Sequence, residues 1–188
     1  MMAATERRHR TLLPHALALL YGLAIAYASL QPFTPWLPPA DGTPFWPFAP
    51  WPPRWTRFDV LANVLAYVPF GLFVALIAQR ASPASRAVHA LCAGITLSFG
   101  LETLQMFLPS RDANLIDLFA NTAGTLAGAM LAAIIVRSER TRRALSTFRH
   151  RVFLPGTLGD VGLALLTVWL AAQINPGISL FAVTFDPD

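Results

Sequence analysis

Two carboxylates, each with an amide side chain on the same helix face, are the residues best suited to chemistry in this chain. Glu102 lies three residues before Gln105, and Asp117 lies four residues before Asn121. Side chains three or four residues apart project from one face of a helix. A carboxylate beside an amide can act as a general acid or base, or it can bind a polar ligand. Glu102 and Asp117 are therefore the candidate catalytic residues.

The composition places these residues in a membrane protein. Of the 188 residues, 55% are hydrophobic and 13% are charged, whereas roughly 25% of an average soluble domain is charged. Ionisable groups inside membrane spans are costly and usually face the bundle interior or a cavity. The few carboxylates within the apolar stretches are therefore informative about function.

Apolar stretches long enough to cross about 30 Å of hydrocarbon occur four times, and a fifth stretch is shorter. They are residues 12–30, 60–78, 87–108, 116–136 and 157–174. The fifth carries Asp160, Gly159 and Gly162, and Gly156 directly precedes it, so it is either a full span or a re-entrant segment. The first follows three arginines, as a cleaved signal peptide would, but its length favours a retained anchor. The sequence predicts an all-α, polytopic membrane helical bundle with about five transmembrane helices.

The arginines predict the orientation of this bundle. All 14 basic residues are arginines. Three precede the first span, two lie in 79–86 and six lie in 137–156, against two in 31–59 and one in 109–115. Because positive charge collects on the cytoplasmic side, we expect a cytoplasmic N-terminus and an external C-terminus. The basic loop 137–156 is interpreted as an amphipathic helix on anionic lipid headgroups, not as a nucleic-acid-binding element.

This orientation brings polar residues of three helices to the same depth. The second and fourth spans begin outside and the third ends outside, so their polar residues share the outer third of the membrane. We predict a binding cluster there, made of Asp59, Asn63, Glu102, Gln105, Arg111, Asp117 and Asn121. A mid-helix carboxyl such as Glu102 must be protonated, paired with a cation or exposed to a water-filled pocket, and we expect it to pair with Arg111.

Some of these positions also have structural explanations. Asp59 and Asp117 stand at helix starts, where a carboxylate caps the helix. Gly124 and Gly128 form the small-xxx-small pattern of close helix approach, and we assign them, with Gly71, to helix packing. No histidine, cysteine or acidic residues have the spacing of a metal site, so we predict neither a metal nor a cofactor.

The first external loop is rich in proline and aromatic residues. Prolines exclude a regular helix, and tryptophans favour the lipid interface. Two interpretations remain open, an aromatic belt on the outer leaflet or a lid over a site for a lipid-tailed or sugar ligand. The aromatic residues are Phe33, Trp36, Phe45, Trp46, Phe48, Trp51 and Trp55.

The order and spacing of the polar residues resemble the VanZ-like family of small bacterial membrane proteins. The resemblance covers residues 12–136, and its Glu-Gln, Arg and Asp-Asn-Gly blocks are Glu102 with Gln105, Arg111, and Asp117 with Asn121 and Gly124. We therefore divide the chain into a VanZ-like transmembrane domain, 1–136, and a segment 137–188 with the basic loop, the fifth span and an external tail. The resemblance implies a cell-envelope protein of the bacterial inner membrane. The founding member is associated with resistance to teicoplanin, a lipid-tailed glycopeptide.

Three classes of function fit the cluster and the resemblance. The first is binding or handling of an amphiphile, a lipid, glycolipid or glycopeptide-like molecule, at the outer leaflet. The second is an enzyme acting on an envelope lipid or glycolipid, with Glu102 or Asp117 as acid or base. No nucleophile or metal motif is evident, which favours binding. The third, a transporter component, lacks an inverted repeat. Membrane lipids are the expected partners, and the oligomeric state stays open.

Overall fold

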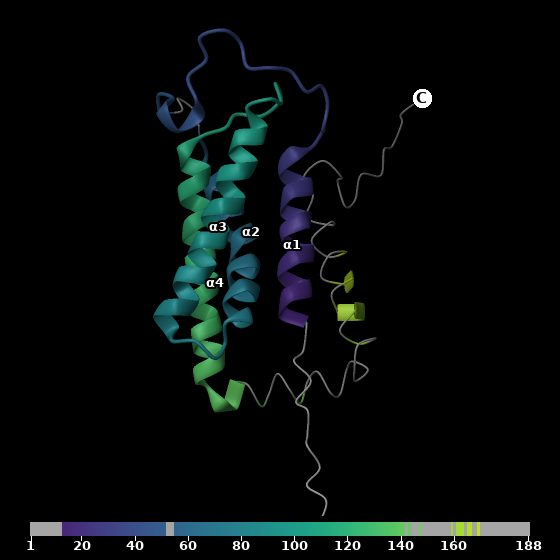
Figure 1. The fold of residues 1–188 in the computed structure, drawn as a ribbon, viewed down its shortest axis with the longest axis vertical. Helices are drawn as coiled ribbons and strands as arrows, with labels where there is room; N and C mark the ends of the chain where they lie inside the picture. Colours follow the sequence, from purple (N-terminus) through teal and green to yellow (C-terminus); the bar gives the residue numbers. More distant parts are fainter. Residues whose placement is uncertain are drawn as a thin grey trace, which may run out of the picture.

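A bundle of long helices forms the part of the chain that the computed structural model describes, namely residues 13–51 and 55–141 together with residues 143, 147, 159, 161–163, 165, 166 and 169. The helices are α1 (Leu13–Leu30), α2 (Arg57–Ile77), α3 (Pro83–Gln105) and α4 (Leu115–Arg137), with one 3-10 turn, η1 (Trp46–Phe48), between α1 and α2. Successive helices run in opposite directions (Figure 1).

All four of these helices are long and apolar enough to cross a membrane, and the described residues form no strand. The prediction of an all-α membrane bundle is therefore confirmed. Most of the fifth span, 157–174, and most of the basic loop, 137–156, lie outside the described residues, and both stay predictions.

The ends of α3 differ from the predicted span 87–108, and both have a local cause. The helix starts earlier because Ser82 caps it: the Ser82 hydroxyl oxygen accepts the backbone N–H of Ser85 at 3.1 Å, and Pro83 occupies the first helical position. The helix ends at Gln105 because Leu108 precedes Pro109, and a residue before proline disfavours the helical conformation. Residues 106–108 instead form a turn that buries Leu108.

Helices α2 and α4 make the closest contact in the bundle, through glycines. A Cβ atom added to Gly71 would collide with the backbone of Thr125 on α4. Cβ atoms on Gly124 and Gly128 would collide with backbone carbonyl groups of α2. The two backbones touch at these three positions, so a residue larger than glycine must push the helices apart.

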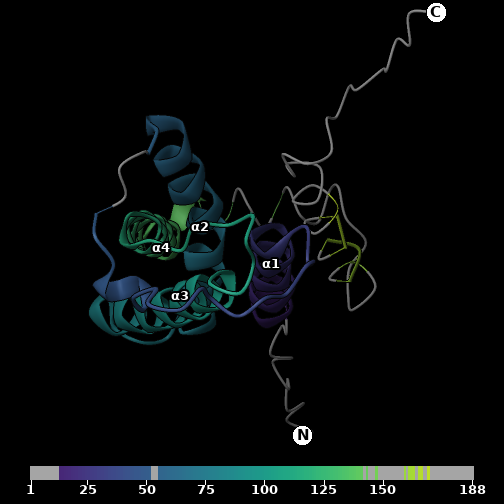
Figure 2. The ribbon, with the colours of Figure 1, turned by 90° about the horizontal axis from the view of Figure 1, so that it is seen from above.

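Helix α1 lies at the edge of the bundle, beside α2 and α3, while α4 sits between α2 and α3 (Figure 2). Only Ala18 and Gly22 of α1 are buried, and Gly22 packs against the ring of Phe70. Leu19 and Leu23 are more than half exposed, as expected of a face that contacts lipid. The weak side-chain packing of α1 means that its position depends on contacts at its end.

The loop between α1 and α2 and the loop between α3 and α4 meet at one end of the bundle (Figure 1). Trp46 fixes the first loop onto α3: its indole N–H donates to the Thr103 hydroxyl oxygen at 3.1 Å, and its ring centroid lies 5.2 Å from that of Phe99. Leu37 donates its backbone N–H to the Phe107 carbonyl at 2.9 Å. The loop between α1 and α2, which we call the aromatic loop, is thus attached to the end of α3 by several contacts.

Candidate functional site

Asn114 is the centre of the polar residues at this end of the bundle. It is the N-cap of α4: its amide oxygen accepts the backbone N–H of Asp117 at 3.0 Å, and its Nδ2 donates to Asp117 Oδ2 at 3.0 Å. Its backbone N–H donates to Glu102 Oε2 on α3 at 2.9 Å. In a capping box that bond goes to an acidic side chain of the same helix. Here Glu102 supplies the acceptor from the neighbouring helix.

Asp117 also connects α4 to α2. Asn63 Nδ2 donates to Asp117 Oδ1 at 2.7 Å, so both carboxylate oxygens of Asp117 accept a hydrogen bond from a side-chain amide. Glu102 is only 3% exposed. The structure therefore brings Asn63, Glu102 and Asp117, from three helices, around one cap residue, as the sequence predicted for this part of the cluster.

The predicted ion pair between Glu102 and Arg111 is wrong. Arg111 Nε donates to the Gln31 carbonyl at 2.8 Å, and Arg111 Nη2 donates to the Ala28 carbonyl at 3.1 Å. These carbonyls lie at the C-terminal end of α1, where helical carbonyls lack intrahelical partners and the helix dipole favours a cation. Within the described residues, Glu102 has no arginine at ion-pair distance.

Two further residues of the predicted cluster have structural partners elsewhere. Gln105 Nε2 donates to the carbonyl of Ser29 at 2.9 Å and to its hydroxyl oxygen at 2.8 Å, which joins α3 to the end of α1. Asp59 forms a capping box with Thr56 at the start of α2 and is exposed. The structure therefore does not bring Gln105 or Asp59 to the Asn114 cap.

A deeper layer contains Asn121, which donates through Nδ2 to the Ser98 hydroxyl oxygen at 2.9 Å. The buried Asn121 Oδ1 atom has no hydrogen-bond partner among the described residues, and the buried hydroxyl of Tyr67 lies within reach of Ser98. Buried polar atoms without partners are uncommon and often mark functional positions. Tyr67 and Asn114 were not among the predicted site residues. Tyr67 follows Asn63 by four residues, and Asn114 precedes Asp117 by three, so helix periodicity and the N-cap rule were the available signals.

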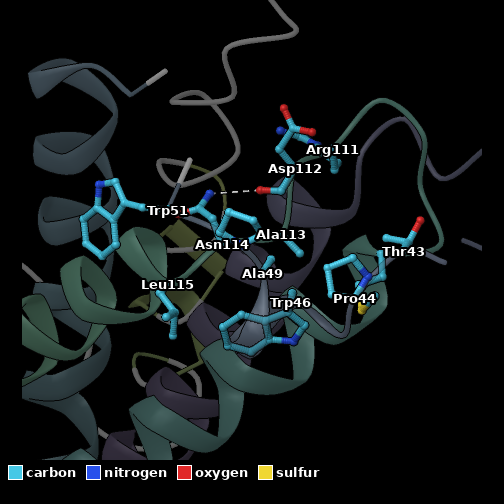
Figure 3. Close-up of a pocket in the computed structure, with 12 residues that line it drawn as sticks. Thr43, Pro44, Trp46, Ala49, Trp51, Arg111, Asp112, Ala113, Asn114 and Leu115 are labelled. Atoms are coloured by element: carbon cyan, nitrogen blue, oxygen red, sulfur yellow. Dashed lines mark hydrogen bonds between the residues drawn. The ribbon is translucent and has the colours of Figure 1, made fainter. Parts of the chain in front are cut away.

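A pocket of about 740 Å³ lies above these residues, between the aromatic loop and the loop from α3 to α4 (Figure 3). Its volume falls in the range of roughly 300–1,000 Å³ that is typical of small-molecule sites. The lining residues are Thr43, Pro44, Trp46, Ala49, Pro50 and Trp51 on one side and Met106, Arg111, Asp112, Ala113, Asn114 and Leu115 on the other. One wall is thus mainly proline and tryptophan, and the other carries charged and amide groups.

The bond between Asn63 and Asp117 gives a direct test of this arrangement. Asp117→Asn should lower the free energy of unfolding by about 1–3 kcal/mol, because an asparagine offers one acceptor oxygen to two amide donors. Adding Asn63→Asp should recover most of this loss, since a new carboxylate on α2 then accepts the bond in the reverse direction. Thermal unfolding of the purified variants measures both effects. A double variant as unstable as Asp117→Asn alone would contradict the contact.

The architecture and the site define a multi-pass membrane protein in which three helices meet at a polar end beneath an aromatic loop. The VanZ/LLP1 family model matches residues 6–136, and the chain belongs to this family, as its polar residues predicted. The match ends one residue before the end of α4, so it spans the helices from α1 to α4. Neither a curated protein nor a solved structure shows a significant match to the chain.

Proposed function

We propose that this VanZ-like protein binds or handles an amphiphilic molecule at the outer leaflet of the bacterial inner membrane. The molecule is a lipid, a glycolipid or a glycopeptide-like compound. The observation that carries the proposal is the pocket of about 740 Å³ with two chemically different walls. An amphiphile matches such a pocket because its apolar and polar parts each find a suitable surface.

The polar wall supplies the groups for the head of the ligand. Arg111 lines the pocket, and its Nη1 has no hydrogen-bond partner among the described residues, whereas Nε and Nη2 hold the guanidinium in place. An arginine fixed in this way binds an anionic or hydroxyl-rich group with little further loss of side-chain entropy. Asp112 and Asn114 add acceptors and donors beside it.

The apolar wall supplies the surface for the tail. Trp46 is 2% exposed and attached to α3, which gives the wall a fixed position. Trp51 and Phe48 are exposed at 60% and 82%, so the aromatic surface continues from the pocket toward the surroundings. Tryptophan rings favour the boundary between lipid headgroups and acyl chains. This loop therefore connects the pocket to the membrane interface.

Glu102 and Asp117 lie beneath the pocket and hold its polar wall in place. Glu102 and Asp117 both bind Asn114, and Asn63 holds Asp117 from α2. Asn121 supports them from the deeper layer through Ser98. In this proposal Arg111 contacts the ligand, and Asn63, Glu102, Asp117 and Asn121 fix the wall that Asn114 belongs to.

The proposal requires that this end of the bundle faces the outside, with the N-terminus in the cytoplasm. Reporter fusions should place residues 45 and 112 outside and residues 83 and 145 inside, because eleven of the fourteen arginines lie in the segments assigned to the cytoplasm. A cytoplasmic signal at residue 112 would move the pocket to the inner leaflet and end the outer-leaflet proposal.

The function itself is tested in cells with and without the protein. We expect altered sensitivity to a lipid-tailed glycopeptide and unchanged sensitivity to the same glycopeptide without its acyl chain, since only the first has both parts of the proposed ligand. Mass spectrometry of the envelope lipids and glycolipids is the companion measurement. A new lipid product would favour an enzyme over a binding protein, and equal sensitivity to both compounds in both strains would contradict the proposal.

A further inference from the structure

At the opposite end of the bundle, Arg86 is buried without a partner. It lies in the first turns of α3 and is only 6% exposed. Its Nε and Nη1 atoms are inaccessible to solvent and have no hydrogen-bond partner among the described residues. A guanidinium in such a place is costly unless an anion binds it, because its donors lose water without gaining another acceptor. The position of Arg86 therefore indicates a missing anionic partner.

A second pocket, of about 450 Å³, lies at this position. Its lining residues are Pro83 and Arg86 from the start of α3 and Ala133, Ile134, Val136 and Arg137 from the end of α4. Two arginines thus share a small pocket whose other walls are apolar. Glu139, the acidic residue nearest to Arg137 along the chain, does not line this pocket. Its Oε1 atom lies 3.0 Å from Nε of Arg143.

The positive charge at this place comes from the two arginines. The start of α3 carries a partial positive charge and the last turn of α4 carries the opposite one, so the two helix ends offset each other. The described lining of the pocket includes no carboxylate that would offset the arginines. One buried and one exposed arginine together favour a compact anion with several acceptor oxygens.

We propose that this pocket binds the phosphate group of an anionic phospholipid. The phosphate oxygens accept hydrogen bonds from Arg86 and Arg137, and the apolar walls formed by Ala133, Ile134 and Val136 contact the glycerol and the first acyl carbons. The apolar walls favour a lipid over free inorganic phosphate, because free phosphate gains nothing from them. Basic pockets between membrane helices are a recurring site for lipid headgroups. The inference is independent of the outer-leaflet pocket.

The ligand is tested with the purified full-length protein in a neutral detergent. Phosphatidylglycerol should raise the midpoint of thermal unfolding by about 5 °C, since a ligand that binds only the folded state stabilises it. Diacylglycerol with the same acyl chains should have no effect, because it lacks the phosphate. Inorganic phosphate, tested alone, shows whether the site binds the phosphate of a lipid or free phosphate. A shift with inorganic phosphate alone would assign the anion site to free phosphate and overturn the lipid, and no shift with either would overturn the site.

Three variants connect the effect to this pocket. Arg86→Gln and Arg137→Gln should weaken the apparent affinity for phosphatidylglycerol at least about tenfold. Arg80→Gln is the matched control, because Arg80 lies in the connection between α2 and α3, six residues before Arg86, but is exposed and outside the pocket. Retention of the full lipid-induced shift by both Arg86→Gln and Arg137→Gln would contradict the proposal.

The stability of the lipid-free protein separates binding from a structural role. Without lipid, Arg86→Gln should be at least as stable as the wild type, because it removes an unpaired buried charge. A lower midpoint for Arg86→Gln together with an unchanged lipid response would make Arg86 a structural residue. If this variant does not accumulate, Arg137→Gln carries the test, since Arg137 is exposed and its replacement leaves the buried side chain in place.

Discussion

Gly124→Leu or Gly128→Leu will remove most of the protein from the membrane. A Cβ atom at either position collides with a backbone carbonyl of α2, and backbone cannot move aside as a flexible side chain does. The helices must separate over their whole contact, which also pulls Asn63 away from Asp117. We expect a loss of more than about 3 kcal/mol, the upper range for overpacking. Immunoblots of isolated membranes, compared at equal transcript level, measure the result.

Gly100→Leu is the control for this prediction. Gly100 is also inside a membrane-spanning helix, but a Cβ atom there meets nothing within 4 Å. Leucine is a better helix former than glycine, so this variant should accumulate at the wild-type level or above. Equal losses for Gly100→Leu and Gly124→Leu would show that the effect comes from the substitution and not from the α2–α4 contact.

Glu102→Ala will abolish the cellular phenotype, and Glu102→Gln will keep it. The glutamine amide oxygen can accept the backbone N–H of Asn114 as the carboxylate does, so the cap of α4 and the polar wall of the pocket survive. Glu102→Ala leaves the buried N–H without an acceptor at a cost of about 1–3 kcal/mol, so it should also lower the protein level. Sensitivity to the lipid-tailed glycopeptide should match that of the wild type in Glu102→Gln and that of cells without the protein in Glu102→Ala.

Asp59→Ala is the matched control for Glu102→Ala. Asp59 is a carboxylate at the same end of the bundle, but it is exposed and, among the described residues, bonds only to Thr56. Its replacement should leave the phenotype unchanged. A wild-type phenotype in Glu102→Ala would contradict the positioning role, and loss of the phenotype in Glu102→Gln would mean that the carboxyl group does more than hold Asn114.

The positions of the helices were predictable because hydropathy depends on local composition. Each observed helix lies within about four residues of its predicted span, and the differences arise at caps such as Ser82 and at Pro109. Side-chain periodicity also predicted which residues of α2, α3 and α4 meet. Asn63, Glu102 and Asp117 do share one site, because small residues place their helices in direct contact.

The partners within the site were not predictable from spacing. Arg111 lies nine residues after Glu102 and can reach it, but the decisive fact is that the C-terminal carbonyls of α1 lie closer to its guanidinium. That proximity depends on where α1 packs, and α1 has few buried side chains that would reveal its position. The hydrogen bond from Asn114 to Glu102 likewise has a backbone N–H as its donor, and a backbone donor cannot be predicted from the residue type.

The cap shared between Glu102 and Asn114 bears on how the chain enters the membrane. The backbone N–H of Asn114, the N-cap of α4, has an acceptor only after α3 stands beside it. If α4 left the translocation channel alone, it would carry an unsatisfied N–H group into lipid, where no water replaces the missing acceptor. The connection of nine residues, 106–114, is short enough for the two helices to leave the channel together. This hydrogen bond therefore favours insertion as a helical hairpin, in which α3 stays in the channel until α4 has formed beside it.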